Sequence, residues 1–291
     1  MLARASGLDL LLFPELAALT TVVVAVPAHS WARSPRLLVL TPTLTGAVGI
    51  ALGRQFGYGP LAVGLVVALS LMLIRLLRSP VMPALSAGLL PLALGIHSWI
   101  YPLALVPGTF GLALLALLRR HRAGERALVD GGSAPPQWPP LRRWLLPLVL
   151  FLVGALLLVR WLGSPLVFYP PLLVIAWETL AHGDHCPWRG RPIALLVATT
   201  AAATIGFLLV RWLGPLPLTT LLVVLAVALL LDRLRLTCPP AFAVALLPFV
   251  VHGSAAALPL HVLLGTLWLL LVAQLMLRRW PGAVGGLRGR E

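Results

Sequence analysis

The sequence predicts an all-α polytopic membrane protein with about eleven transmembrane helices, arranged as two parallel five-segment repeats joined by one linker helix. The first observation is composition. Sixty per cent of the 291 residues are hydrophobic and only 10% are charged, whereas a soluble domain carries about 25% charged residues. The second is repetition, because residues 31–109 align without a gap with residues 188–266, which begin 157 positions later. Lipid offers the backbone no hydrogen-bond partner, so apolar spans must be helical.

The apolar blocks have the length that a bilayer core of about 30 Å requires. The blocks are 9–28, 37–53, 59–74, 80–97, 99–118, 144–160, 165–181, 193–210, 214–231, 238–257 and 259–277. Two of them, 80–97 and 238–257, are rich in proline and small residues and could instead be re-entrant hairpins. With eleven crossings, one face carries only Arg4, Arg54, Arg160 and Arg211 of the 22 basic residues. The positive-inside rule then predicts a multi-pass inner-membrane protein with its N-terminus outside and its C-terminus in the cytoplasm.

The two repeats share residues that shape a backbone. The identical pairs are Trp31/Trp188, Pro35/Pro192, Gly49/Gly206, Arg54/Arg211, Gly57/Gly214, Pro60/Pro217, Arg78/Arg235, Pro83/Pro240, Pro91/Pro248, Pro102/Pro259 and Gly108/Gly265. Duplicated helical halves are a common way to build a transporter. The expected organisation is a first repeat at 1–118, a cytoplasmic Arg/Gly/Pro-rich loop at 119–143, a linker transmembrane helix at 144–164, a second repeat at 165–280 and a cytoplasmic tail at 281–291.

Several short stretches resemble the HPP family of integral membrane proteins. They are Phe13-Pro14-Glu15-Leu16, Ala25-Val26-Pro27-Ala28-His29-Ser30, Pro83-Ala84-Leu85-Ser86-Ala87 and Ser98-Trp99. The resemblance implies a domain of four to five hydrophobic segments, and some members of the family resemble nitrite transporters. The tripeptide that gives the family its name is replaced by Val81-Met82-Pro83 in the first repeat and by Cys238-Pro239-Pro240 in the second.

Two acidic residues fall inside predicted spans. Glu15 follows Pro14 in the first span, where a buried carboxyl group usually faces a cavity or a partner. It is a candidate for proton coupling or substrate orientation; the alternative places it near the outer headgroups. Glu178 lies about one turn from the cytoplasmic end of segment 165–181, where pairing with a loop arginine is the simpler interpretation. Arg54 and Arg211 could draw an anion towards a vestibule, or they could anchor the helix ends at the interface.

Two further patterns are candidates for a site. Pro83 and Pro240 are among the prolines that both repeats keep inside predicted spans, where proline breaks the helix and frees backbone groups. Half-helix N-termini meeting there would favour an anion. The loop residues His182, His185 and Cys186 include types that bind Zn²⁺, but no second half of a metal site is evident, so a solvated loop is the simpler interpretation.

These observations predict a secondary transporter or facilitator for a small solute, plausibly an inorganic anion such as nitrite, with its site between the two repeats near the proline-broken helices. The alternatives are a membrane-embedded enzyme acting on a lipid-type substrate and a non-transporting membrane scaffold. We expect no enzymatic activity and no cofactor. The expected partners are the bilayer and the solute, with oligomers possible; the net charge of +14 is explained by arginines at anionic headgroups, without nucleic acid.

Overall fold

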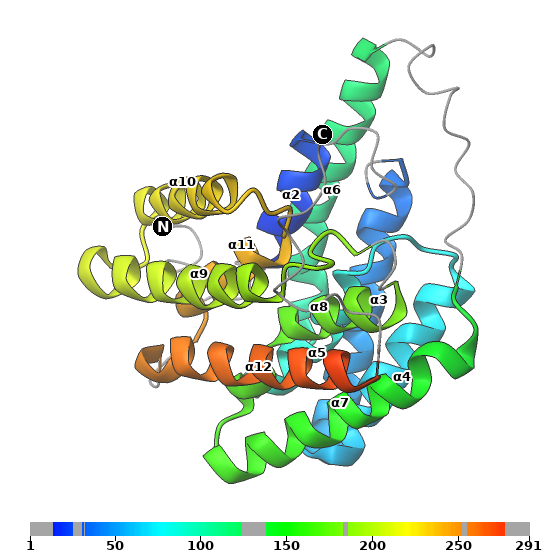
Figure 1. Ribbon diagram of the computed structural model, residues 1–291. Helices are drawn as coiled ribbons and strands as arrows, with labels where there is room; N and C mark the ends of the chain where they lie inside the picture. The colour runs from blue at the N-terminus through cyan, green and yellow to red at the C-terminus, as the bar shows by residue number, and fades with distance from the viewer. Residues whose placement is uncertain are drawn as a thin grey trace, which may run out of the picture. The chain divides into compact units, whose positions relative to one another are not determined.

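A computed structural model describes residues 14–25, 31, 33–123, 138–182, 186–251 and 255–276. In these ranges the chain forms α-helices and short 3-10 helices and no strand (Figure 1). The predicted all-α class is therefore confirmed for the described residues. The chain divides into two compact units, Met1–Trp138 and Pro139–Glu291. Much of the predicted loop 119–143, the start of the first predicted span and the tail 281–291 lie outside the described residues.

The described residues of unit 1 form five helices. They are α2 (Glu15–Ala25), α3 (Pro35–Phe56), α4 (Pro60–Leu76), α5 (Ala84–Leu94) and α6 (Ile100–Ala123). Helix α3 packs against α4, α5 and α6, and α2 packs against α6. All of α5 except its last residue is buried, so this short helix forms the centre of the unit. Longer helices surround it and leave leucines such as Leu61 and Leu103 exposed.

Unit 2 begins with α7 (Leu141–Leu162), which corresponds to the predicted linker helix. The other elements are η3 (Pro165–Phe168), α8 (Pro170–Ala181), α9 (Pro192–Leu213), α10 (Pro217–Arg233), α11 (Pro240–Leu246), η4 (Leu247–Phe249), η5 (Ala255–Ala257) and α12 (Leu258–Met276). Helix α9 packs against α10, α11 and α12, while α7 packs against α12, η3 and α8. The predicted linker is thus an integral part of the second unit.

Five of the described helices are long and apolar enough to cross a membrane. They are α3, α6 over Ile100–Arg119, α7, α9 and α12. Helices α5 and α11 are shorter: α5 has 11 residues and α11 has 7, about half or less of the roughly 20 that a continuous helical span needs. Both are preceded by non-helical residues, at 79–83 and 236–239. The predicted spans 80–97 and 238–257 are therefore not continuous helices.

Two pairs of helices, with one member in each unit, begin and end at positions that are related by the 157-residue spacing of the sequence repeat. Helices α3 and α9 both have 22 residues, and α4 and α10 both have 17. Each of these pairs begins 157 positions apart, at Pro35 and Pro192 and at Pro60 and Pro217. The two described non-glycine residues with positive φ, Arg78 and Arg235, are 157 apart as well, and both have φ 48°. Each terminates the helix before it.

Glycines at matched positions allow helices to touch through their backbones. A Cβ on Gly49 of α3 would lie 2.1 Å from the carbonyl oxygen of Gly88 in α5. A Cβ on Gly206 of α9 would lie 1.9 Å from the carbonyl oxygen of Ala245 in α11. Only glycine permits this approach. Helix α5 is therefore held against α3, and α11 against α9, at matched positions of the two repeats.

Candidate functional site

Glu15 is the first residue of α2, and it is buried at 1% exposure. Pro14 precedes it; proline has no N–H, so it suits the start of a helix, where N–H groups lack intrahelical partners. Glu15 is also the only acidic residue in the described part of unit 1. The structure therefore places this carboxyl group inside the protein.

The Glu15 carboxylate accepts a hydrogen bond from the Ser86 hydroxyl group. Ser86 lies in the first turn of α5, which begins at Ala84 directly after Pro83. Pro83 is thus the N-cap of α5 and begins a helix instead of kinking one. The Glu15–Ser86 bond joins the N-terminal ends of two half-length helices. The second carboxylate oxygen, Oε2, is buried and has no hydrogen-bond partner.

Helix α6 brings a further polar group to this region. Tyr101 of α6 donates a hydrogen bond of 2.9 Å to the Ala87 carbonyl oxygen. Tyr101 also lies close enough to Glu15 for the two groups to interact electrostatically. We call Glu15, Ser86 and Tyr101 the unit 1 polar centre.

Unit 2 has hydroxyl groups, and no carboxyl group, at the start of its corresponding helix α8. Tyr169, the N-cap residue of α8, shares a 2.8 Å hydrogen bond with Thr266 of α12. Thr266 also lies 3.2 Å from the Thr199 hydroxyl of α9. The residue that aligns with Glu15 is Pro171, and the residue that aligns with Ser86 is Ala243. The two units are therefore chemically different, because among the described residues only unit 1 has a carboxyl group at this position.

The remaining predicted site residues lie apart from this centre. Glu178 is partly exposed and lies 3.3 Å from His182 Nδ1. Arg191, an arginine of the loop that follows Glu178, donates hydrogen bonds to the carbonyl oxygens of Leu234 (2.7 Å) and Arg235 (2.6 Å). Arg54 and Arg211 are exposed in the last turns of α3 and α9.

Pro240 is the first residue of α11, and Pro83 directly precedes α5. Both prolines therefore lie at the start of a short helix. The paired prolines Pro102 and Pro259 also fall in first turns, of α6 and α12. Proline removes no intrahelical bond there. The prolines thus mark where helices start more often than where they bend.

The predicted metal ligands gain no further support. His185 lies outside the described residues. His182 is partly exposed, whereas Cys186 is buried, and burial raises the pKa of the Cys186 thiol to about 12. Among the described residues, no group of three or more His, Cys, Asp and Glu side chains could hold a metal ion.

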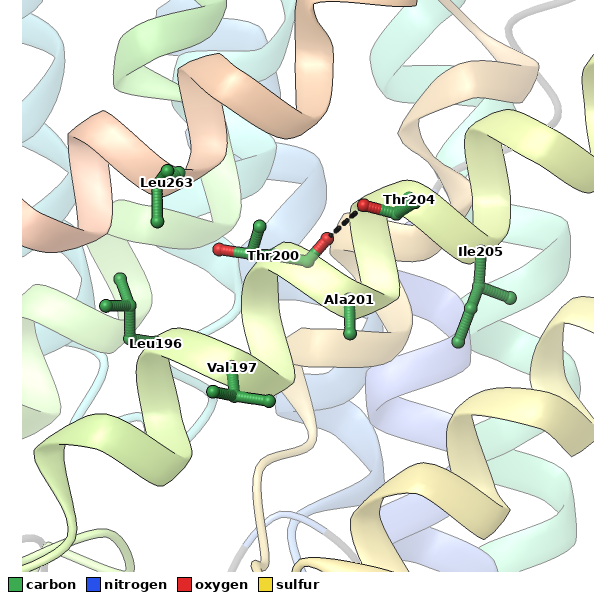
Figure 2. Close-up of a pocket in the computed structure, with 7 residues that line it drawn as sticks. All are labelled: Leu196, Val197, Thr200, Ala201, Thr204, Ile205 and Leu263. Carbon is green, nitrogen blue, oxygen red and sulfur yellow. Dashed lines mark hydrogen bonds between the residues drawn. The ribbon is translucent and has the colours of Figure 1, made fainter.

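A groove of about 420 Å³ lies on unit 2 between α9 and α12 (Figure 2). Its lining is apolar apart from two threonines: Leu196, Val197, Thr200, Ala201, Thr204, Ile205 and Leu263. The Thr204 hydroxyl donates to the Thr200 carbonyl oxygen at 2.8 Å, as the dashed line shows. The Thr200 hydroxyl itself is buried and unpartnered. Nothing charged lines this groove, so it lacks the groups that would orient an ionic solute.

The sequence alone identified Glu15, and Pro14 and Pro83 beside it, but not Ser86 or Tyr101. Ser86 is the serine inside the apolar segment 80–97, and this was the available signal. Comparison with known proteins gives no further guide: no protein-family model, curated protein or solved structure matches the chain.

Proposed function

We propose that this protein is a multi-pass secondary carrier or facilitator of a small inorganic anion, nitrite being the first to test. The observation that supports this most is the hydrogen bond between Glu15 and Ser86 at the joined N-terminal ends of α2 and α5. Helix N-termini attract negative charge, and discontinuous helices carry the substrate sites of many transporters. The resemblance to the HPP family, some of whose members resemble nitrite transporters, is a second reason for this proposal.

The proposal includes a tandem duplication with parallel repeats and eleven crossings. Matched helix lengths, matched φ values and matched backbone contacts, each 157 residues apart, support the duplication. The eleven crossings need segments 79–94 and 236–251 to span as an extended stretch followed by a short helix. Their burial supports this, because irregular backbone is tolerated at membrane depth only where protein covers it. The inner membrane, an outside N-terminus and a cytoplasmic C-terminus complete the proposal.

The lipid-enzyme alternative receives no specific support from the described residues. Acid–base chemistry at the cytoplasmic face would need the histidines and the aspartate of loop 182–185, and of these only His182 is described. The scaffold alternative is harder to reconcile with Glu15, since an inert core has no need of a buried carboxyl group, whose desolvation is costly. We therefore retain the carrier as the single proposed function.

The test is anion uptake by full-length protein in proteoliposomes, using nitrite, nitrate, formate and chloride one at a time. We expect saturable uptake of at least one of them, and a loss of at least tenfold in Ser86→Ala. The matched control is Thr179→Ala, which also removes a buried hydroxyl group but lies in unit 2. If a folded wild-type protein moves none of the four anions faster than empty vesicles, the proposed function is wrong.

A further inference from the structure

Glu15 occupies the position that an anion would need. The first turn of a helix has N–H groups without intrahelical partners and a partial positive charge. Helices α2 and α5 each have 11 residues, and their first turns meet at the Glu15–Ser86 hydrogen bond. The carboxylate is thus a tethered anion at the two helix ends. A free anion would have to share this region with it.

The groups around Glu15 offer it little compensation. From α5 it receives one hydrogen bond, donated by Ser86. From α6, Tyr101 lies nearby, but its hydroxyl donates to the Ala87 carbonyl oxygen. Arg119 of α6 donates a hydrogen bond to the carbonyl oxygen of Val24, at the opposite end of α2 from Glu15. Among the described residues of unit 1, no arginine is buried beside Glu15.

One buried polar atom here lacks a partner, Oε2 of Glu15. Buried polar atoms are rarely left unsatisfied, so each such atom needs an explanation. The Ser86 hydroxyl group and the free N–H groups of the two helix ends are hydrogen-bond donors that could bind an anion once the carboxylate charge is removed.

We propose that Glu15 makes this site an anion–proton symport site: a small monovalent inorganic anion binds at the N-termini of α2 and α5 only when the Glu15 carboxyl group is protonated. The inference rests on the proposed carrier function and specifies its coupling ion. One proton binds one carboxylate oxygen, one anion takes the place of the lost charge, and both leave together. The net charge moved is zero. Two negative charges that share one buried site repel each other strongly. The anion is therefore excluded while Glu15 is ionised.

The first experiment follows proton and anion movement in proteoliposomes loaded with a pH-sensitive dye. An inward nitrate or nitrite gradient should acidify the lumen of wild-type vesicles. Uptake should rise as external pH falls, by up to about tenfold per pH unit, and should not respond to a membrane potential. Glu15→Gln keeps the shape of the protonated acid and cannot ionise. It should move the anion without protons, independently of pH, and faster with an inside-positive potential.

The matched control is Glu178→Gln, which removes the partly exposed acidic residue of unit 2 and should behave as the wild type does. A second readout avoids dependence on transport. Nitrite or nitrate should raise the Tm of the wild type at pH 6 but not at pH 8, and that of Glu15→Gln at both, because a ligand stabilises the state that binds it. If Glu15→Gln does not fold, the wild-type measurements alone decide.

The outcomes separate the two proposals. Anion uptake without proton movement, equal at pH 6 and pH 8, would refute symport and leave the carrier standing. Anion-dependent stabilisation without uptake by any variant would refute the carrier and leave the site standing. A Tm that rises with Na⁺ or K⁺, in the wild type but not in Glu15→Gln, would show a cation site and overturn the inference.

Discussion

Single glycines set how closely the central helix of each unit can approach its neighbour. Gly49 and Gly206 stand where a Cβ would overlap a carbonyl oxygen of the facing helix, at 2.1 Å and 1.9 Å. A backbone atom cannot swing aside as a flexible side chain can. The whole of α5 or α11 would have to move, which would also displace Ser86 from Glu15 in unit 1.

Gly49→Ala and Gly206→Ala should each destabilise the protein by at least about 2 kcal/mol, because overpacking a tight helix contact forces the backbone apart. Gly64→Ala is the matched control. Gly64 lies inside α4, where an added Cβ would meet nothing within 4 Å, and alanine is the better helix former by up to about 1 kcal/mol. Thermal unfolding in detergent measures all three. A Gly49→Ala protein as stable as Gly64→Ala would contradict the close approach.

Arg78 provides a second prediction for a single residue, because it holds a left-handed backbone conformation at φ 48°. This conformation costs an L-residue about 1–2 kcal/mol, whereas glycine adopts it freely. Arg78→Gly should therefore raise stability by roughly 0.5–1 kcal/mol after the flexibility of glycine in the unfolded chain is allowed for. Arg75→Gly, in the last turn of α4, relieves no such strain and should lower stability by up to about 1 kcal/mol. Equal effects of the two substitutions on Tm would rule out this account.

At the scale of elements, the short helices differ from the long ones in burial. Helices α5 and α11 have no lipid-facing side, whereas α7 and α9 expose many apolar side chains, among them Trp161 and Trp212. A short helix inside a ring of longer ones can end at membrane depth, because protein satisfies its free backbone groups. This arrangement places the N-terminal end of α5 beside that of α2.

The loop between α8 and α9 is fastened to the end of α10 by Arg191, through hydrogen bonds to the carbonyl oxygens of Leu234 and Arg235. Cys186 is buried in this loop, and its thiol has a pKa raised to about 12 by burial. An ordinary cysteine thiol has a pKa of about 8.5. At pH 8.5 the thiolate fraction of Cys186 is therefore smaller by roughly a thousandfold, and maleimide labelling should be slow.

Arg191→Ala should release the loop and speed the labelling of Cys186 by at least tenfold, measured in a Cys238→Ser background. The physical reason is that an exposed thiol regains both access and its ordinary ionisation. Arg211→Ala, an exposed arginine at the other end of α9, is the control and should leave the rate unchanged. Labelling that is as slow in Arg191→Ala as in the control would show that Arg191 does not hold the loop.

For the whole molecule, the number of crossings decides which side of the membrane each loop occupies. Eleven crossings put the N-terminus and the loop 119–143 on opposite faces; if segment 79–94 re-entered, both would lie on one face. Ser6→Cys and Ser133→Cys, each introduced singly into a cysteine-free protein, should therefore react differently with a membrane-impermeant maleimide in intact cells. Ser6→Cys should label and Ser133→Cys should not. Labelling of both from the same side would refute the eleven-span topology.

The sequence predicted the helical class and most of the helix positions, because apolar length and prolines at helix starts are local properties. The bounds of α3, α9 and α12 lie within a few residues of the predicted spans. It left open whether 80–97 and 238–257 are spans or re-entrant hairpins, and it did not predict the short helices α5 and α11, since both apolar runs are long enough for continuous spans. Their short lengths depend on neighbours that bury non-helical residues such as Ser79 and Val81, which precede α5.

The candidate site was likewise only partly predictable from the sequence. A carboxyl group after a proline in an apolar segment identified Glu15, because the cost of a buried charge is a property of the residue itself. Its partner Ser86 is 71 residues away in the chain, and nothing local links the two.

The sequence by itself determined an apolar helical chain with repeated helix-starting prolines and close-contact glycines, because hydrophobicity and backbone preference belong to individual residues and their spacing. Only the tertiary structure decided that two half-length helices meet at their N-terminal ends in unit 1, with a carboxyl group between them. That meeting depends on which helices pack together, and packing is a property of surfaces far apart in the chain.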